Sequence, residues 1–307
     1  MRSKRRVAFL ATIGALGAVW SYSRRVVRRW EDLELEEVEK PGRTVRVDGV
    51  DLHYVDAGNG APLLLLHGLG GSTFGFRHLI PILSPRFRVL ALDLKGFGYS
   101  ERPPDGDYSL TAQVRLVKGF LDALNIEQAA VLGHSLGGAV AMRLAVDFPE
   151  RVERLILVSS ASDRETRRGV RGAALLRPFL PIVGAFTLQN RWFRERSLRS
   201  GCYDPAFITP EVMEGYLRPS RIHGHLRSLG RLMVDRKNDP PLDPSAIRQP
   251  TLIIWGESDR WLPPSRGRAL QETVPDSRLV VVERAGHLVL EERPEESARA
   301  ISDFLRP

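Results

Sequence analysis

Short, largely apolar runs recur along this chain of 307 residues, and they constrain its fold more than any other feature. A run of about four to eight apolar residues is typical of a strand that is buried on both faces of a sheet. Such strands are predicted at Leu63–Leu66, Val89–Leu92, Ala129–Leu132, Leu155–Val158, Thr251–Trp255 and Leu279–Val282. Stretches of helical periodicity alternate with them, at Thr111–Leu124, Leu136–Asp147, Ser265–Thr273 and Glu295–Leu305. Strands that alternate with helices predict an α/β fold with a mostly parallel, doubly wound sheet.

Two regions of the chain depart from this alternation. Thr44–Val47 and Asp51–Asp56 alternate apolar and polar residues on either side of Asp48-Gly49, which predicts an antiparallel hairpin at the start of the domain. Residues 161–245 are helical in tendency, are interrupted by prolines and contain no convincing buried strand. We therefore predict one domain over residues 43–307, with a helical cap inserted at about residues 161–245.

The formal net charge of +8 resides in the first thirty residues. Residues 1–30 carry eight of the 45 basic residues and no acidic residue, so that 37 basic residues face 37 acidic ones over residues 31–307. A nucleic-acid-binding protein would be expected to carry its basic patch on the folded domain. The charge distribution therefore predicts no nucleic-acid partner.

An apolar run of seventeen residues, 7–23, separates two basic clusters in this leader. As a helix it would span about 25 Å, slightly less than the ~30 Å of a bilayer's hydrocarbon core. Flanking arginines and Trp20 would suit the membrane interface. We therefore predict that residues 1–30 form an uncleaved membrane anchor and that the protein is membrane-associated. A signal peptide, with export after its cleavage, is the alternative.

Acidic residues follow the leader and end at Pro41-Gly42, which predicts a solvated linker over residues 31–42. The chain has a single cysteine, Cys202, which excludes an internal disulfide and offers too few thiolates for a structural zinc site. The histidines of the strand-end motifs are too far apart in sequence to indicate a metal cluster. We therefore predict no metal and no cofactor, and nothing in the sequence indicates a particular oligomeric state.

Residues 133–137 read G-H-S-L-G, which matches G-x-S-x-G, the pattern of a serine at the tip of a sharp strand-to-helix turn. Such a turn is crowded, and a side chain at either glycine would collide with the neighbouring strand or helix. A serine hydroxyl is a weak nucleophile and needs a base, which in turn needs an orienting partner. Ser135 is the candidate nucleophile.

Two other strand ends supply candidates for the base and the acid. His287 follows the last predicted strand in a glycine-preceded loop, and it is the candidate base. Asp259 lies four residues past the run 251–255, where its carboxylate can accept a hydrogen bond from His287 and fix the tautomer. Glu257 and Asp163 are its rivals, because each also follows a predicted strand.

The oxyanion formed by nucleophilic attack needs donors aimed at it. The Leu136 amide begins a helix and is one candidate. The Leu69 amide is the other, because the glycines around it let the backbone approach the serine. His67 is expected to be a structural hydrogen-bonding residue. The predicted apolar pocket combines Leu69 and Leu136 with Phe74, Trp261 and Leu288.

The chain order serine, acid, histidine, with H-G-L-G-G at 67–71 and D-L-K-G-F-G-Y-S at 93–100, resembles the α/β-hydrolase superfamily over residues 43–307. The resemblance implies that Asp93 shapes the floor of the site and that its role is structural. Lys95 stands where relatives more often have arginine. A serine at 135 speaks against the epoxide hydrolases and haloalkane dehalogenases of the superfamily, which attack with an aspartate. The size and the helical cap are similar to those of carboxylesterases, monoacylglycerol lipases, cofactor-free haloperoxidases and carbon–carbon bond hydrolases.

We therefore expect a serine hydrolase that cleaves a carboxylic ester, of a small molecule or a lipid, through an acyl-enzyme. The alternative is a carbon–carbon bond hydrolase acting on a dienoate-type diketone, which should need a cap arginine for the substrate carboxylate. Nine arginines against three acidic residues over 163–199 leave that alternative open. A non-catalytic, ligand-binding member is a third hypothesis, and its mark would be the loss of a triad residue.

Overall fold

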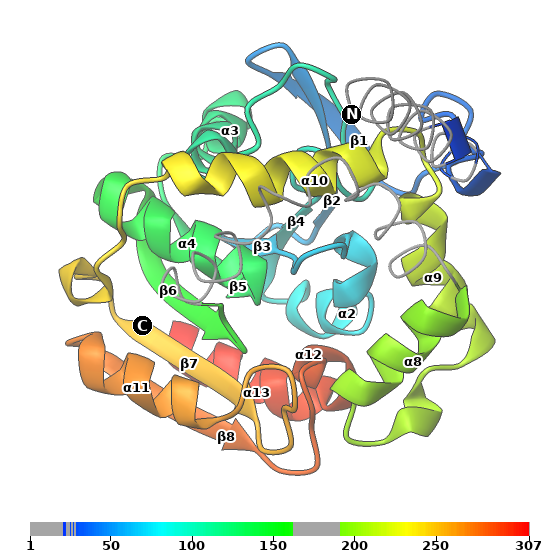
Figure 1. Ribbon diagram of the computed structural model, residues 1–307. Helices are drawn as coiled ribbons and strands as arrows, with labels where there is room; N and C mark the ends of the chain where they lie inside the picture. The colour runs from blue at the N-terminus through cyan, green and yellow to red at the C-terminus, as the bar shows by residue number, and fades with distance from the viewer. Residues whose placement is uncertain (1–20, 23–24, 26, 28, 162–190, 307) are drawn as a thin grey trace, which may run out of the picture.

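A single eight-stranded sheet forms the centre of the protein (Figure 1). The structure is a computed structural model, and the residues that it describes are 21–22, 25, 27, 29–161 and 191–306. The strands are β1 (Arg43–Val47), β2 (Val50–Ala57), β3 (Ala61–Leu66), β4 (Phe87–Leu92), β5 (Ala129–His134), β6 (Val152–Val158), β7 (Thr251–Gly256) and β8 (Ser277–Val282). Their order across the sheet is β1-β2-β4-β3-β5-β6-β7-β8.

Pairing within the sheet follows the sequence pattern. The β1–β2 hairpin is antiparallel, and β2 pairs antiparallel with β4. From β4 onward, each neighbouring pair of strands is parallel. The predicted hairpin and the predicted doubly wound, mostly parallel α/β sheet are therefore confirmed.

The helices occupy the connections between strands. They are α2 (Leu79–Leu83), α3 (Leu110–Ala123), α4 (Leu136–Asp147), α8 (Arg191–Gly201), α9 (Pro210–Ser220), α10 (His225–Asp235), α11 (Ser265–Thr273), α12 (Val289–Glu292) and α13 (Pro294–Leu305). Short 3₁₀ turns are η1 (Thr73–Phe76), η2 (Pro149–Arg151), η3 (Pro205–Phe207), η4 (Arg236–Asn238) and η5 (Pro244–Ala246). The periodic stretches predicted α3, α4, α11 and α13 to within one residue at each end. The short helices α2 and α12 were beyond what periodicity can detect.

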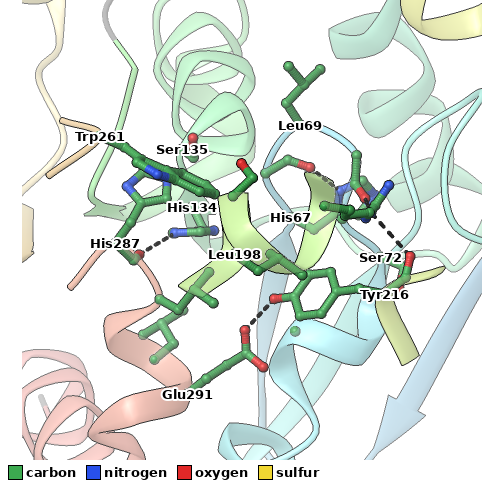
Figure 2. Close-up of a pocket in the computed structure, with 18 of the residues that line it drawn as sticks. His67, Leu69, Ser72, His134, Ser135, Leu198, Tyr216, Trp261, His287 and Glu291 are labelled. Carbon is green, nitrogen blue, oxygen red and sulfur yellow. Dashed lines mark hydrogen bonds between the residues drawn. The ribbon is translucent and has the colours of Figure 1, made fainter. Parts of the chain in front are cut away.

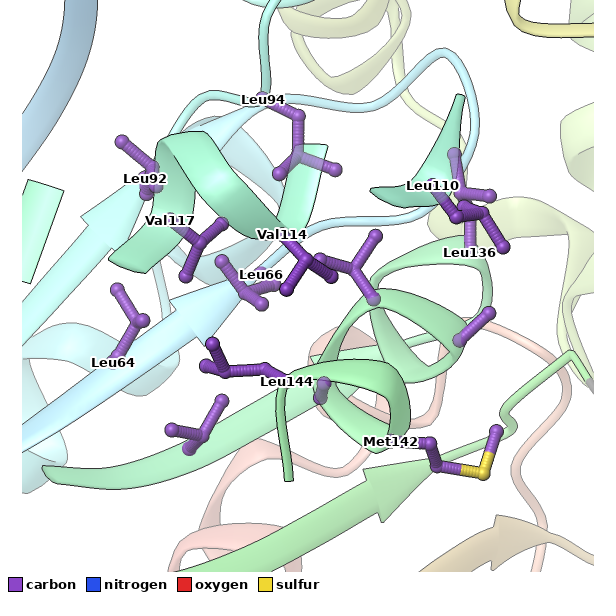
Figure 3. Packing of buried hydrophobic residues seen from close by; sticks show 14 of the residues in the cluster. Leu64, Leu66, Leu92, Leu94, Leu110, Val114, Val117, Leu136, Met142 and Leu144 are labelled. Atoms are coloured by element: carbon purple, nitrogen blue, oxygen red, sulfur yellow. The ribbon is translucent and has the colours of Figure 1, made fainter. Parts of the chain in front are cut away.

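Side chains of β3 pack into both layers of the core, because they alternate between the two faces of the sheet. Leu64 and Leu66 pack in a cluster with side chains of α3 and α4, such as Val114 and Leu144 (Figure 3). Leu63 and Leu65 point the other way, into a second cluster with side chains of α2 and α13. Burial on both faces explains why the central strands are continuous apolar runs.

The sheet's parallel strands end at a common edge. Leu66 pairs with Gly133, and Val158 pairs with both His134 and Ile254, so that the ends of β3, β5, β6 and β7 lie side by side. In open α/β sheets, ligands bind beyond these carboxyl ends. The loops that start there carry His67, Ser135, Asp259 and His287.

Helices α8, α9 and α10 lie between β6 and β7 in the chain, and the described residues 191–250 contain no strand of the sheet. In Figure 1, α8 and α9 lie at the right of the view, and α10 runs across its upper part. The boundaries of a cap at residues 161–245 stay a prediction, because residues 162–190 lie outside the described part of the chain.

The expectation of a membrane localisation is contradicted. Across the described residues, none of the helices is both long enough and apolar enough to cross a bilayer. The helix expected to cross the bilayer was the apolar run 7–23. Apart from Ser21 and Tyr22, this run lies outside the described residues.

The segment predicted as a linker makes specific contacts at its first residues. The Asp32 carboxylate accepts two hydrogen bonds from the Arg221 guanidinium, at 2.8 and 2.7 Å. Leu33 forms a parallel bridge with Ile222, in the turn between α9 and α10. Residues 31–33 therefore lie against the start of α10, a helix that reaches the pocket described below.

Candidate active site

Ser135 occupies the turn between β5 and α4, in a conformation that few residues adopt. Its φ is +52° and its ψ is −113°, outside the regions that side chains favour. A Cβ on Gly133 would lie 2.3 Å from the carbonyl oxygen of Gly137, and a Cβ on Gly137 would lie 2.2 Å from that of Leu66. Both glycines are therefore required sterically, and the crowding expected from the G-x-S-x-G pattern is present.

His287 and Asp259 form a buried hydrogen-bonded pair. The Nδ1 of His287 lies 2.8 Å from the Oδ2 of Asp259. A carboxylate only accepts, so Nδ1 carries the hydrogen, and in the neutral ring Nε2 is left as the basic nitrogen. The other carboxylate oxygen accepts from the amides of Trp261 and Leu262, at 2.9 and 2.8 Å.

The environment of Asp259 favours its charged form. Burial on its own raises the pKa of this carboxyl group, but the hydrogen bond and charge of His287 and the Leu262 amide outweigh burial. The net result is a pKa below the ordinary value of 3.8. Asp259 is therefore an ionised acceptor at neutral pH, as an orienting acid must be.

Backbone contacts and ring packing hold the His287 imidazole in place. The His287 amide donates to the carbonyl of Gly201 at 2.6 Å. The imidazole packs between the rings of Trp261 and His134, with each ring centroid 4.9 Å away. The Nε2 of His134 donates to the His287 carbonyl at 2.9 Å, and burial lowers the pKa of His134 to about 3, so this ring is neutral.

Ser135 and His287 line the same pocket and lie on the same side of it as Trp261 (Figure 2). Among the residues that the structure describes, no hydrogen bond joins the Ser135 hydroxyl to His287. Catalytic hydrogen bonds are often long without substrate and tighten in the Michaelis complex. The structure therefore brings nucleophile and base to one cavity, whereas their direct contact stays a prediction.

The loop after β3 lies directly against the serine. A Cβ on Gly68 would be 3.1 Å from the Cβ of Ser135, and Gly70 adopts a φ of +67° in a turn closed by the Gly71 amide on the Gly68 carbonyl. Leu69 stands in this turn. Leu136 is the first residue of α4, so its amide has no acceptor within the helix. The role of these two amides as oxyanion donors stays a prediction.

His67 and Asp93 hold this loop. The Nδ1 of His67 donates to the Gly68 carbonyl at 2.7 Å, and its Nε2 accepts from the Leu94 amide at 3.1 Å. With both nitrogens engaged, His67 has a structural role. Asp93 is fully buried and accepts from His53 Nδ1 and from the amide of Thr73, at 2.8 and 2.6 Å.

The pocket in front of Ser135 has a volume of about 380 Å³. Of the predicted pocket residues, Leu69, Trp261 and Leu288 line it. Phe74 does not, because its ring packs against Tyr216 at 5.7 Å behind the wall, and Phe76 lines the cavity instead. The side chain of Leu136 lies in the core with α3 and α4 and does not line the cavity (Figure 3).

Several polar residues of the pocket were not predicted, and the larger ones among them are Arg194, Tyr216, His225 and Glu291. The Tyr216 hydroxyl donates to one oxygen of Glu291, and Arg77 donates to the other. Burial raises the pKa of Glu291. Two signals were available: a glutamate in the turn after His287, and the excess of arginines over residues 163–199, which include Arg194. The tyrosine and the histidine carried no signal.

Arg194 belongs to α8 and is buried at the pocket wall. Its Nη2 donates to the carbonyls of Gly70 and Tyr216, at 2.8 and 3.1 Å. Burial lowers the pKa of Arg194 to about 10, so the guanidinium remains charged at neutral pH. One side chain thus connects α8 and α9 to the loop that carries the Leu69 amide.

Two rivals of Asp259 were considered from the sequence. Glu257 is exposed, and Asp163 lies outside the described residues. Within the described ranges, no three histidine, cysteine or acidic side chains are grouped so that they could hold a metal ion.

The sheet order, the strained serine turn and the histidine–aspartate pair at the strand ends define an α/β hydrolase. The chain belongs to the α/β-hydrolase fold family, whose model matches residues 61–294, and it is a hydrolase. The uncharacterised hydrolase YugF of Bacillus subtilis (strain 168) is 31% identical over 279 residues, which cover 88% of this chain and 100% of that protein.

Two further proteins are similar over most of their length. The 2-hydroxy-6-oxo-6-phenylhexa-2,4-dienoate hydrolase of Comamonas testosteroni is 31% identical over 272 residues, which cover 83% of this chain and 91% of that protein. Among solved structures, the meta-cleavage product hydrolase CumD of Pseudomonas fluorescens IP01 superposes with a TM-score of 0.71 at 29% identity. That match covers 86% of this chain and 97% of the other.

The glycine requirement at the serine turn predicts a contrast between two Gly→Ala substitutions. Gly137→Ala would place a Cβ against the Leu66 carbonyl and displace Ser135. We expect a loss of about 1–3 kcal/mol in unfolding free energy and at least a ~100-fold loss of turnover. Gly230→Ala, inside α10 with open space around the new Cβ, should leave turnover unchanged and stabilise by up to ~1 kcal/mol. Urea unfolding and steady-state kinetics measure both, and equal effects of the two substitutions would contradict the account.

The lowered pKa of Asp259 predicts how stability depends on pH. Its folded pKa lies below the unfolded value of about 3.9, so its stabilisation is present above roughly pH 4 and is lost as the pH falls through the folded pKa. Asp259→Asn should therefore destabilise by about 1–3 kcal/mol at pH 7, with a smaller difference from wild type at pH 3. Urea unfolding at both values tests this. Asp303→Asn on the exposed face of α13 is the control, and a deficit for Asp259→Asn that grows in acid would refute the assignment.

Proposed function

We propose that the protein hydrolyses a carbon–carbon bond in a dienoate-type diketone that carries a carboxylate, and that it does so through an acyl-enzyme on Ser135. This is the alternative raised from the sequence, and we now prefer it to ester hydrolysis. The observation that carries it is Arg194, a charged guanidinium buried in the wall of the pocket that contains Ser135 and His287.

The relatives support the same reaction class. Both similar proteins with a named activity are hydrolases of dienoates or meta-cleavage products, and both align with more than four-fifths of this chain. The pocket of about 380 Å³ is lined mainly by apolar side chains, such as Phe76, Leu198 and Leu290, with Arg194 among them. An apolar cavity with one buried cation suits a conjugated carbon skeleton that ends in a carboxylate.

In the proposed mechanism, His287 takes the proton of Ser135 as the hydroxyl attacks the ketone carbonyl, and Asp259 stabilises the imidazolium. The Leu69 and Leu136 amides donate to the oxyanion. The substrate reacts as its 2-keto tautomer, in which the 2-hydroxyl proton has moved to the carbon next to the ketone, so collapse of this intermediate breaks a bond to a saturated carbon. The dienolate that leaves takes the proton back from His287. Water, activated by the same histidine, then hydrolyses the acyl-enzyme.

A carbon leaving group is poor unless its negative charge is delocalised. In the 2-keto tautomer, the charge left on the cleaved carbon spreads along the conjugated chain to the 2-keto oxygen, next to the carboxylate. A buried guanidinium near that end stabilises the charge far more than it would in water, because the surrounding dielectric is low. Arg194 is already held by its bonds to two carbonyls, so little reorganisation is required of it.

Ester hydrolysis is the second candidate, since one observation favours it. The same nucleophile, base and oxyanion donors cleave an ester without an electron sink, and the apolar lining would accept an acyl chain. In that case, Arg194 would serve only to join α8 to the loop at Gly70.

A substrate comparison separates the two candidates. We expect wild-type protein to release benzoate from 2-hydroxy-6-oxo-6-phenylhexa-2,4-dienoate with a kcat/KM at least tenfold above that for any 4-nitrophenyl ester of two to eight carbons. Arg194→Lys, which keeps the charge but loses the planar donor fork, should lower the dienoate value by about 10- to 100-fold and change the ester values by less than threefold. Arg196→Met, on the exposed face of α8, is the matched control.

Two results would contradict the proposal. Efficient ester turnover without dienoate cleavage would reject the proposal in favour of an esterase. A loss of both activities in Arg194→Lys would assign this residue to the oxyanion loop and not to the substrate.

A further inference from the structure

His225 is a polar residue of the pocket that the proposed mechanism leaves unused. It is the first residue of α10 and lines the cavity shared by Ser135 and His287, with only 2% of its surface exposed. Its Nδ1 is buried, and among the described residues it has no hydrogen-bond partner. Burying a polar atom without a partner is unfavourable, and an apolar side chain would fill the same space without that penalty.

The position of this ring is fixed by its neighbours. The imidazole packs edge to face on Phe97, with centroids 5.9 Å apart and an interplanar angle of 87°. The buried Glu31 carboxylate accepts from the amides of Gly224 and Leu226, at 2.9 and 2.7 Å, and so clamps the residues on both sides of His225. Such support is what holds a recognition group within the tolerance that binding requires.

Charges around the ring indicate the kind of ligand. Burial, followed by the charges of Arg102 and Arg194, lowers the pKa of His225 well below its ordinary value, so the ring is neutral. A neutral imidazole can donate from one nitrogen. Arg102 lies among the buried carboxylates of Asp93 and Glu31, so the charge that acts on the cavity is that of Arg194. A positive charge favours an anionic oxygen, and an anionic oxygen can only accept.

We propose that His225 is a specificity-determining residue whose ring N–H donates to a carboxylate oxygen of the substrate, at the pocket wall formed by α10. The inference rests on the proposed function for the identity of that substrate. His225 supplies a directional hydrogen bond, and Arg194 supplies the charge. Together they select molecules with a carboxylate end over purely apolar ones, because a ligand without that oxygen leaves the histidine unpaired.

Binding measurements in a Ser135→Ala background test this without requiring turnover. The probes are 2-hydroxy-6-oxo-6-phenylhexa-2,4-dienoate and its methyl ester, which has the same skeleton without the carboxylate charge. We expect His225→Leu to weaken binding of the acid by about 10- to 100-fold and to change binding of the methyl ester by less than threefold. His225→Asn, which keeps an N–H close to the position of Nδ1, should recover most of the affinity.

His223→Leu is the matched control, because His223 lies two residues away on the same turn but faces Glu34 at 3.4 Å on the surface. It should leave both affinities unchanged, and thermal unfolding midpoints check that each variant is folded. Equal weakening of acid and ester by His225→Leu, no weakening at all, or no binding of the acid to any variant overturns the inference. A wild-type protein that binds the acid through His225 but does not cleave it rejects the proposed reaction and leaves this inference standing.

Discussion

The backbone contact between the β5–α4 turn and the end of β3 is the constraint on which the site depends. Gly137 lies so close to the Leu66 carbonyl that no Cβ fits between them, and Gly133 is equally close to Gly137. This close packing forces Ser135 into a positive φ and puts its hydroxyl at the carboxyl edge of the sheet. The strain is tolerated because β3 and β5 are buried on both faces and cannot shift.

Around that fixed point, each remaining part of the site is held by hydrogen bonds that leave few groups free to move. Asp259 is oriented by two backbone amides before it bonds His287. The loop with Leu69 is held by two side chains: His67 donates to the Gly68 carbonyl, and Arg194, from α8, donates to the Gly70 carbonyl. Preorganisation of this kind lets donors and charges stabilise a transition state without rearranging during the reaction.

Sequence reasoning recovered the fold and the strand-end residues because both follow from local rules. Continuous apolar runs marked the central strands, and the shared edge of a parallel sheet predicted that Ser135, Asp259 and His287 would meet. The side chains of the pocket wall were harder, since helices α8 to α10 have no motif that fixes their packing. Phe74 was predicted to line the pocket, whereas it lies in a 3₁₀ turn and its ring packs against Tyr216. The pocket position of His225 could not be predicted for the same reason. The residues on either side of it are held by Glu31, which lies nearly 200 positions away in the sequence.

Covalent labelling tests the central claim, that this geometry makes Ser135 a nucleophile activated by His287. Folded protein would be treated with a fluorophosphonate, and the modified residue would be located by peptide mass spectrometry. We predict a single stoichiometric adduct on Ser135, formed more slowly in His287→Ala by a factor of at least ~1000. An adduct on another residue, or labelling of Ser135 at an unchanged rate in His287→Ala, would contradict it.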